Sequence, residues 1–188
     1  MDIHGHGTGI RRRAGFTVLE LLVTLTIAAI LLVTGAPTFQ QFTWKQRMRA
    51  AVGHLHNDLL VARSEAVFGS VSTVACPGAP RTGCADSTDW SRGWIVFSDL
   101  NGDQQRQPEE AVLRHGQALE ALAITGTRGR DRVRFLPDGS APGSNGTIGF
   151  CGLGGPERAR KLVISNIGRI RRDLYPGIDP ERCQAPRN

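Results

Sequence analysis

The chain has 188 residues, 40% of them hydrophobic and 21% charged, and its 23 Lys and Arg against 17 Asp and Glu give a net charge of +6. That length suits one ordinary domain rather than a two-domain enzyme, and the hydrophobic share excludes a wholly disordered protein. Almost every basic residue is an arginine, whose planar guanidinium suits phosphate or carboxylate, so a basic partner is disfavoured. Gly and Pro follow no fixed period, which excludes collagen-like or solenoid repeats.

An apolar block runs from Phe16 through Val33, and Glu20 is its only ionisable side chain. Eighteen residues at the helical rise span about 27 Å, close to the hydrocarbon thickness of a bilayer. The block follows three arginines at 11–13, which predict that the N-terminus stays in the cytoplasm and the C-terminal part lies outside it. The sequence therefore predicts a single-pass membrane protein.

Residues 15–20, which read GFTVLE, resemble the cleavage and methylation site of type IV prepilins and pseudopilins. The resemblance implies that residues 1–15 are a leader, that a prepilin peptidase cuts between Gly15 and Phe16, and that the new amine of Phe16 is methylated. A carboxylate at membrane depth is costly and usually marks a function. The resemblance implies that Glu20 pairs with the Phe16 amine of a neighbouring subunit during assembly; the alternative is a signal anchor whose glutamate lies near the interface by chance.

The helical pattern continues after this block. Pro37 is expected to kink or end the first helical stretch, because it lacks a backbone N–H. An apolar stripe then returns at spacings of three and four residues, in Val52, Leu55, Leu59, Ala62 and Ala66. Polar positions alternate with it, at Lys45, Arg47, Arg49, Asp58 and Arg63. We expect one long, gently broken helix from Phe16 to about Phe68, with residues 16–36 as transmembrane or filament-core helix and 37–68 as its amphipathic continuation.

Short β-like runs follow Gly69, and they are predicted at residues 71–75, 93–98, 111–114, 133–136, 147–151, 161–165 and 168–172. Asn101-Gly102 is a hairpin signal between the second and third runs. Residues 69–188 are therefore predicted to form a β-rich globular domain, an antiparallel sheet region packed on the helix. The fold class is α+β.

Four cysteines lie in the part of the chain that the arginines place outside the cytoplasm, which suggests disulfides. Three pairings are possible. Cys76 and Cys84 enclose a short loop and form the natural local pair, which leaves Cys151 and Cys183. The Cys-x-x-Cys spacing of a zinc site is absent.

Further blocks extend the resemblance over almost the whole chain after the leader. They are Cys76 with Cys84, WSRGWIVF at 90–97, DLNGD at 99–103, FLPDG at 135–139, Phe150-Cys151 and IGRIR at 167–171. Together they resemble the FimT/GspH family of minor type IV pilins and type II secretion pseudopilins, which implies a type IV pilin-like fold. The GRIR element is similar to the DNA-binding motif of the FimT branch. Gln104 departs from the family, which usually has glycine there, and Arg172 extends the basic motif by one residue.

The positive charge is concentrated in two C-terminal segments. Residues 126–134 carry a net charge of +3 and residues 156–172 carry +5, whereas the rest of the chain after the leader sums to −4. Such segregation is an electrostatic footprint for nucleic acid. In a strand, Arg169 and Arg171 would lie on one face and Ile170 on the other, and Arg132 and Arg134 would likewise oppose their apolar neighbours.

The predicted DNA-binding residues are Arg169, Arg171 and Arg172, with Arg158, Arg160, Lys161, Arg128, Arg130, Arg132 and Arg134 widening the patch. Gly168 is expected to allow close approach of a phosphate chain. Few aromatic side chains are near, so the contacts should be with phosphates, independent of sequence and sensitive to salt. The alternatives are a solvated arginine face or pairing with acidic residues of neighbouring subunits.

Two weaker patterns concern metals and catalysis. Residues 99–110 place oxygen ligands at positions one, three, five and twelve of an EF-hand-like loop, but Gln104 stands where that loop wants glycine, so a polar hairpin loop is favoured over a calcium site. His54 and His56 lie two apart and share no helix face, so solvated histidines are favoured over a metal pair. No nucleophile elbow, P-loop or paired His-Glu motif is present. We expect no cofactor, no metal and no enzyme activity.

These observations predict a minor type IV pilin, closest to FimT, that binds double-stranded DNA through a basic face during pilus assembly and natural transformation. The resemblance implies other pilins, a prepilin peptidase and the bacterial inner membrane as partners, with the C-terminal domain in the periplasm. The alternative, from the GspH branch, is a minor pseudopilin of the type II secretion system that binds only other pseudopilins.

Overall fold

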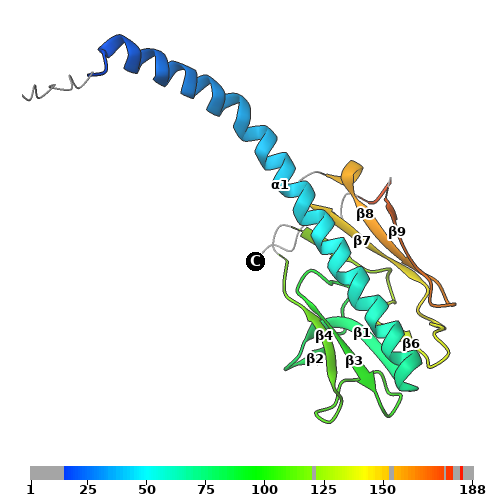
Figure 1. Ribbon diagram of the computed structural model, residues 1–188. Coiled ribbons are helices and arrows are strands. Elements are labelled where there is room, and N and C mark those ends of the chain that lie inside the picture. Colours follow the sequence, from blue (N-terminus) through cyan, green and yellow to red (C-terminus); the bar gives the residue numbers. More distant parts are fainter. Residues whose placement is uncertain (1–14, 120–121, 153–154, 176, 180–182, 184–188) are drawn as a thin grey trace, which may run out of the picture. The chain divides into compact units, whose positions relative to one another are not determined.

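The structure is a computed structural model that describes residues 15–119, 122–152, 155–175, 177–179 and 183; within the helix, the side chains at 33–38 and 40 are not described. The chain divides into two compact units, Met1–Gln40 and Gln41–Asn188. In chain order the elements are α1 (Val18–Gly69), β1 (Ser72–Ala79), β2 (Gly83–Cys84), β3 (Trp94–Asp99), β4 (Val112–Gly116), β5 (Leu122–Thr125), β6 (Val133–Phe135), β7 (Gly146–Gly152), the short 3₁₀ helix η1 (Pro156–Arg158), β8 (Arg160–Ile164) and β9 (Ile170–Leu174) (Figure 1).

The N-terminal end of α1 is capped by a residue that the sequence analysis did not single out. The backbone N–H of Glu20 donates to Thr17 Oγ1 at 3.2 Å, so Thr17 is the N-cap and satisfies one of the free donors of the first turn. Glu20 lies in that turn, where a carboxylate complements the helix dipole. The helix continues through Pro37, where a kink or an end was expected, so the possibility that it ends there is excluded. The predicted leader through Ala14 lies outside the described residues.

Among the described residues, none of the helical stretches has both the length and the apolarity that crossing a bilayer requires.

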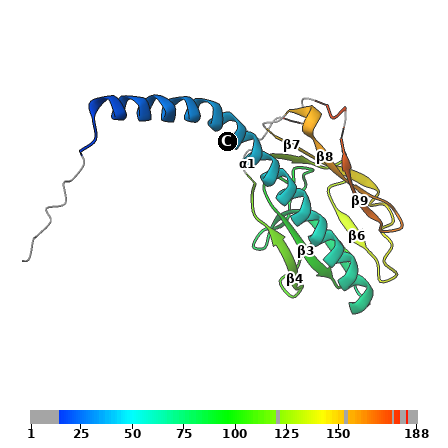
Figure 2. The same cartoon turned by 45° about the horizontal axis from the view of Figure 1, so that its top comes forward.

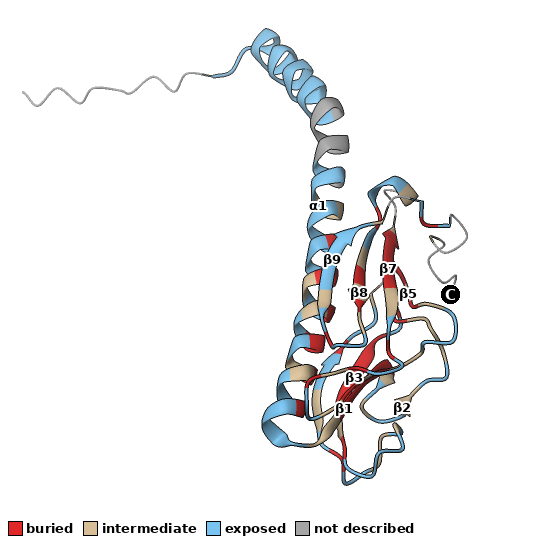
Figure 3. Cartoon of the chain, turned by 90° about the vertical axis from the view of Figure 1, so that its right-hand side faces the viewer, coloured by how far each residue is buried: buried red, intermediate tan, exposed pale blue. Residues whose placement is uncertain are grey.

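The C-terminal half of α1 supplies one wall of the main core of the second unit. All five residues of the apolar stripe are buried, and Leu55 and Leu59 are fully so. Burying a leucine side chain stabilises a fold by about 1.5–3 kcal/mol relative to leaving it exposed. The predicted stripe is therefore confirmed, and it determines which face of α1 turns toward the strands (Figure 3).

Asp58 was counted among the polar positions of α1, but it is buried. Its Oδ2 accepts a hydrogen bond of 2.8 Å from the indole Nε1 of Trp94, and His54 Nδ1 lies 3.7 Å from the same oxygen. A buried carboxylate must be hydrogen-bonded to be tolerated. Asp58 therefore fixes how the Trp94 ring is seated between α1 and β3.

The first sheet has the strand order β2-β1-β3-β4, and β6 also pairs with β1. Its inner face carries Ala75, Val96 and Phe135 into the core shared with α1. Its outer face carries a second, smaller cluster that includes Val74, Ile95 and Phe97. The expected hairpin is confirmed, since β3 and β4 pair antiparallel, with a long connection in place of a tight two-residue turn.

The second sheet has the order β5-β7-β8-β9, and all of its pairings are antiparallel. Its inner face adds Phe150 and Leu162 to the same core, so the C-terminal half of α1 lies across both sheets (Figure 2). The α+β fold class, a long helix packed on antiparallel strands, is confirmed. The strands β2 and β5 were not predicted.

Two disulfides are present, with the pairing that the sequence spacing favoured. Cys76–Cys84 joins β1 to β2 with a Cα–Cα distance of 5.6 Å, and Cys151–Cys183 ties residue 183 to β7 with a Cα–Cα distance of 5.0 Å. Loops of this length gain about 2–4 kcal/mol from closure. The second bond supports a small cluster on the outer face of the second sheet, formed with Ala159 and Ile178.

Candidate nucleic-acid interface

The basic motif near the C-terminus forms a β-hairpin. Its two strands, β8 and β9, pair from Ile164 opposite Ile170 to Arg160 opposite Leu174. The turn between them is closed by Ser165, whose backbone N–H donates to Arg169 O at 3.0 Å and whose hydroxyl accepts from the Arg169 N–H at 3.2 Å. Arg169 is therefore held in the turn with its side chain exposed, and β9 is an edge strand of its sheet.

The three arginines that were expected to act together are divided between two faces. Residues opposite one another in an antiparallel pair project to the same side of the sheet. Arg172 is opposite Leu162, which is buried against α1, so Arg172 lies on the α1 side. Arg171 is opposite Val163 and lies on the other side. Arg171 and Arg172 therefore cannot present their side chains on the same face, because neighbouring residues of a strand point in opposite directions.

Lys161 shares the outer face with Arg171. It is opposite Asp173, and its Nζ lies 5.1 Å from the centre of the Tyr175 ring. Arg160 is opposite Phe150 of β7 and so lies on the α1 face with Arg172. Arg158 is exposed in η1.

Gly168 was expected to allow close approach of a phosphate chain, but it allows close approach of another part of this chain. This glycine is buried with φ of 74°, a conformation that side chains rarely adopt, and a Cβ there would collide with the carbonyl oxygen of Gly139. The same oxygen accepts a 2.8 Å hydrogen bond from Arg63 Nε, and Ala141 N–H donates to Asn166 O at 2.7 Å. The close approach joins the hairpin turn to the loop at 136–141, and no room is left there for a phosphate.

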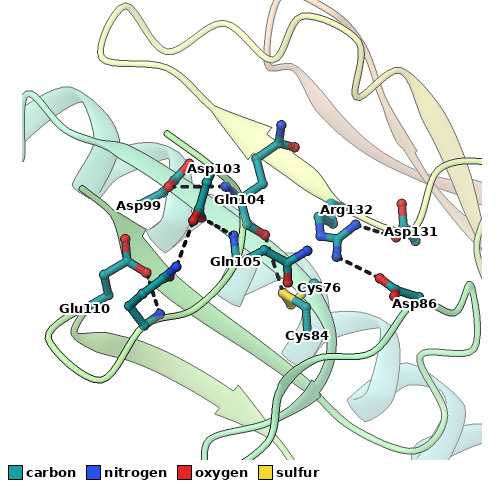
Figure 4. Close-up of a disulfide and its surroundings, with 11 residues drawn as sticks. Cys76, Cys84, Asp86, Asp99, Asp103, Gln104, Gln105, Glu110, Asp131 and Arg132 are labelled. Carbon is teal, nitrogen blue, oxygen red and sulfur yellow. Dashed lines mark hydrogen bonds and ion pairs between the residues drawn. A yellow bond between two sulfur atoms is a disulfide. The ribbon is translucent and has the colours of Figure 1, made fainter. Parts of the chain in front are cut away.

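The other arginine-rich segment, residues 126–134, runs from the end of β5 in the second sheet into β6, which pairs with β1 of the first sheet. Arg132 is largely buried and contacts two carboxylates, Asp86 at 2.9 Å and Asp131 at 2.7 Å (Figure 4). Arg134 is opposite Val74 and therefore lies on the outer face of the first sheet. Arg128 and Arg130 are exposed in the preceding turn. The ten predicted residues thus form separate groups.

Lys45 and Arg49 of α1 were not predicted as binding residues, but they line the same cavities as Arg160 and Arg172. Two adjoining cavities, of about 560 and about 330 Å³, lie between α1 and the β9 edge, and Arg49 and Arg160 line both. Lys45 lines the smaller cavity and Arg172 the larger. The only signal in the sequence was their placement on the polar side of an amphipathic helix.

His56 of α1 lies near Arg172 of β9. The pKa of His56 lies below its usual value, first because the ring is partly buried and second because the Arg172 guanidinium is near. Hydrogen bonds with Asn57 and with the backbone of Ile170 oppose this shift. His56 is therefore packed against β9 rather than solvated, which corrects the expectation from its position on α1.

The loop from Asp99 to Glu110 is held by its own hydrogen bonds. Asp99 Oδ1 accepts from the Gly102 and Gln104 N–H groups at 3.0 and 3.3 Å, and Glu110 accepts from the Leu100 N–H at 2.9 Å. Burial raises the pKa of Asp99. Gln104 has φ of 62°, in the region that favours glycine. Within the described part of the chain, no group of three or more His, Cys, Asp or Glu residues could hold a metal ion.

A capped N-terminal helix whose second half packs on antiparallel sheets, together with an N-terminal processing motif, defines a type IV pilin-like protein. Residues 51–168 match the family model described as type II transport protein GspH, and residues 10–36 match the prokaryotic N-terminal methylation motif. The first match covers more than half of the chain, so the chain belongs to the GspH family.

Solved structures share this fold. The minor pilin FimU of Pseudomonas aeruginosa is 24% identical with a TM-score of 0.57, and the match covers 70% of this chain and 92% of FimU. The minor pseudopilin EpsH of the Vibrio cholerae type 2 secretion system is 13% identical with a TM-score of 0.50, and covers 70% and 99%. No curated protein matches the chain.

Proposed function

We propose that this protein is a minor type IV pilin of the FimT kind that binds DNA without sequence preference, in pilus assembly and DNA uptake. The observation that carries the DNA-binding part is the β8–β9 hairpin, which presents Arg169 in its turn and Arg171 on its outer face. Both side chains are exposed, and neither forms a salt bridge with a described residue. Exposed guanidiniums without carboxylate partners are available to phosphates.

In this proposal the N-terminal part of the chain anchors the protein in the membrane and joins it to neighbouring subunits. A prepilin peptidase would cut between Gly15 and Phe16, and the apolar block would anchor the protein in the bacterial inner membrane with its C-terminal domain in the periplasm. The match to the methylation motif supports processing. The described apolar side chains of the first unit are exposed, which suits packing against lipid or other pilins, and Glu20 would pair with a neighbour's amine. The function proposed is structural and non-enzymatic.

The test is the double variant Arg169→Gln with Arg171→Gln in the full chain, purified in detergent. We expect roughly tenfold weaker binding of duplex DNA at low salt and a salt dependence reduced by about two phosphate contacts. The matched control is Arg81→Gln with Arg114→Gln, which removes the same charge at two exposed positions outside the predicted patches. Equal affinity of the hairpin variant and the wild-type chain in gel-shift assays would refute this site.

A second candidate function is a minor pseudopilin of a type II secretion system. The match to the GspH family model favours it, and so does the fold shared with EpsH. Crosslinking in cells separates the two candidates: a pseudopilin would be captured with other pseudopilins and would bind no DNA at any salt concentration.

A further inference from the structure

A groove lies between α1 and the edge of the second sheet, and cations line both of its walls. We name it the basic groove and define it by Lys45 and Arg49 on α1, Arg158 in η1, and Arg160 and Arg172 on β8 and β9. Its two cavities share Arg49, Arg160 and Leu174, so they form one continuous depression.

Strand register and helix periodicity both direct these cations into the groove. Arg160 and Arg172 share the α1 face of the second sheet as diagonal neighbours, which places their Cβ atoms about 7–8 Å apart. Lys45 and Arg49 are four residues apart and so share a face of α1. Arg172 lines the larger cavity together with Arg49 and Val52 of α1, which places this side chain beside the helix.

The charge of the basic groove is not balanced from within the molecule. Its lining has five cations against two carboxylates, Glu157 and Asp173. None of the five cations forms a salt bridge with a residue that the structure describes. Like charges brought this close repel one another, and an anion between the walls would relieve that repulsion.

The chemistry of the lining favours a nucleic acid over a protein as that anion. The cores of protein–protein interfaces are depleted of charged residues, whereas nucleic-acid interfaces are strongly positive. Four of the five cations are arginines, whose forked donors match phosphate oxygens.

We infer that the basic groove binds the phosphate backbone of DNA as a second contact surface, on the opposite side of the sheet from Arg171. This inference rests on the proposed function. It adds the helix α1 to the DNA-binding surface, and it assigns Arg172 to the groove rather than to the hairpin's outer face.

The test compares two triple variants of the full chain in detergent. Arg49→Gln, Arg160→Gln and Arg172→Gln remove three cations from the groove. Arg47→Gln, Arg81→Gln and Arg114→Gln remove the same charge elsewhere; Arg47 is an exposed arginine of α1 that lines a different cavity. Binding of a short DNA duplex is measured by fluorescence anisotropy across a salt series. We expect the groove variant to lose about two to three units of salt slope and at least tenfold in affinity, and the control variant to lose little.

A second groove variant keeps the inference testable if the triple variant fails to fold. Lys45→Ala with Arg49→Ala changes only exposed residues of α1, and alanine favours the helix. We expect this variant to keep the wild-type melting temperature and to lose about two units of salt slope.

The experiments distinguish a failure of the groove inference from a failure of the proposed function. If groove variants keep wild-type affinity while Arg169→Gln with Arg171→Gln weakens binding, the groove inference is overturned and the proposed function stands. If the wild-type chain binds no DNA, the proposed function fails, and the groove inference fails with it. If the groove substitutions abolish binding of polyglutamate but leave DNA binding intact, the ligand is an acidic protein segment and the inference is overturned.

Discussion

The chain has two arginine-rich segments that look alike in sequence, residues 126–134 and 156–172, and their surroundings differ. In the first, Arg132 is largely buried between Asp86 and Asp131. In the second, Arg160, Arg171 and Arg172 are exposed and form no salt bridge with any described residue. Net charge along a chain therefore does not reveal which cations are available to a ligand. A cation is unavailable when a carboxylate from a distant part of the chain pairs with it, as Asp86 does with Arg132.

The largest difference between the two segments is expected from a glycine substitution, Gly168→Ala in the second segment. The substitution places a Cβ against the carbonyl oxygen of Gly139 and forces a side chain into a left-handed conformation, so we expect a loss of about 3 kcal/mol in unfolding free energy. Gly129→Ala is the matched control in the other segment, because Gly129 has φ of 73° and open space around it. Its cost should be about 1 kcal/mol. Chemical denaturation of both variants measures the difference, and equal losses would show that the contact with Gly139 is unimportant.

The next largest effect is expected from Arg132→Ala. Removing this side chain leaves two carboxylates without their partner, one of them partly buried, so we expect a loss of about 2 kcal/mol. Arg130→Ala, an exposed change in the same segment, should stay within about 0.5 kcal/mol. The folded Arg132→Ala protein should keep wild-type DNA affinity. A strong loss of affinity without loss of stability would contradict the structural role of Arg132, because this residue would then be a ligand contact.

The smallest effect concerns pH and His56, which packs beside Arg172. Because its pKa is lowered in the folded chain, mainly by burial and then by Arg172, the unfolded chain binds more protons near and below the ordinary value of 6.5. Stability should therefore fall as the pH decreases through that value. In His56→Gln this part of the pH dependence should disappear, as thermal melts between about pH 8 and pH 5 would show. A variant with the wild-type pH profile would mean that another group is responsible.

Much of the fold could be predicted because burial follows a period in those parts of the sequence. The stripe from Val52 to Ala66 has helical spacing, and the strands at 94–99 and 146–152 have turn residues on either side. By contrast, β5 was missed because Leu122, Ala123 and Ile124 are all buried, and a short continuous run of apolar residues has no strand period.

The candidate site was harder to predict than the fold, because it depends on pairs far apart in the chain. Arg132 meets Asp86, which lies 46 residues before it. Arg49 and Arg172 line one cavity although more than a hundred residues separate them. The register of the β8–β9 hairpin decides which arginine faces α1, and a one-residue shift would exchange Arg171 with Arg172.

The bond between Cys151 and Cys183 makes the packing near the C-terminal end of the chain depend on its redox surroundings. Thiols are kept reduced in the bacterial cytoplasm, so neither this bond nor Cys76–Cys84 would persist there. Until an oxidising compartment is reached, the cluster of Ala159 and Ile178 would lack its covalent link to residue 183. Loss of that link would free residue 183 from β7, while the core beneath α1 would keep its apolar packing.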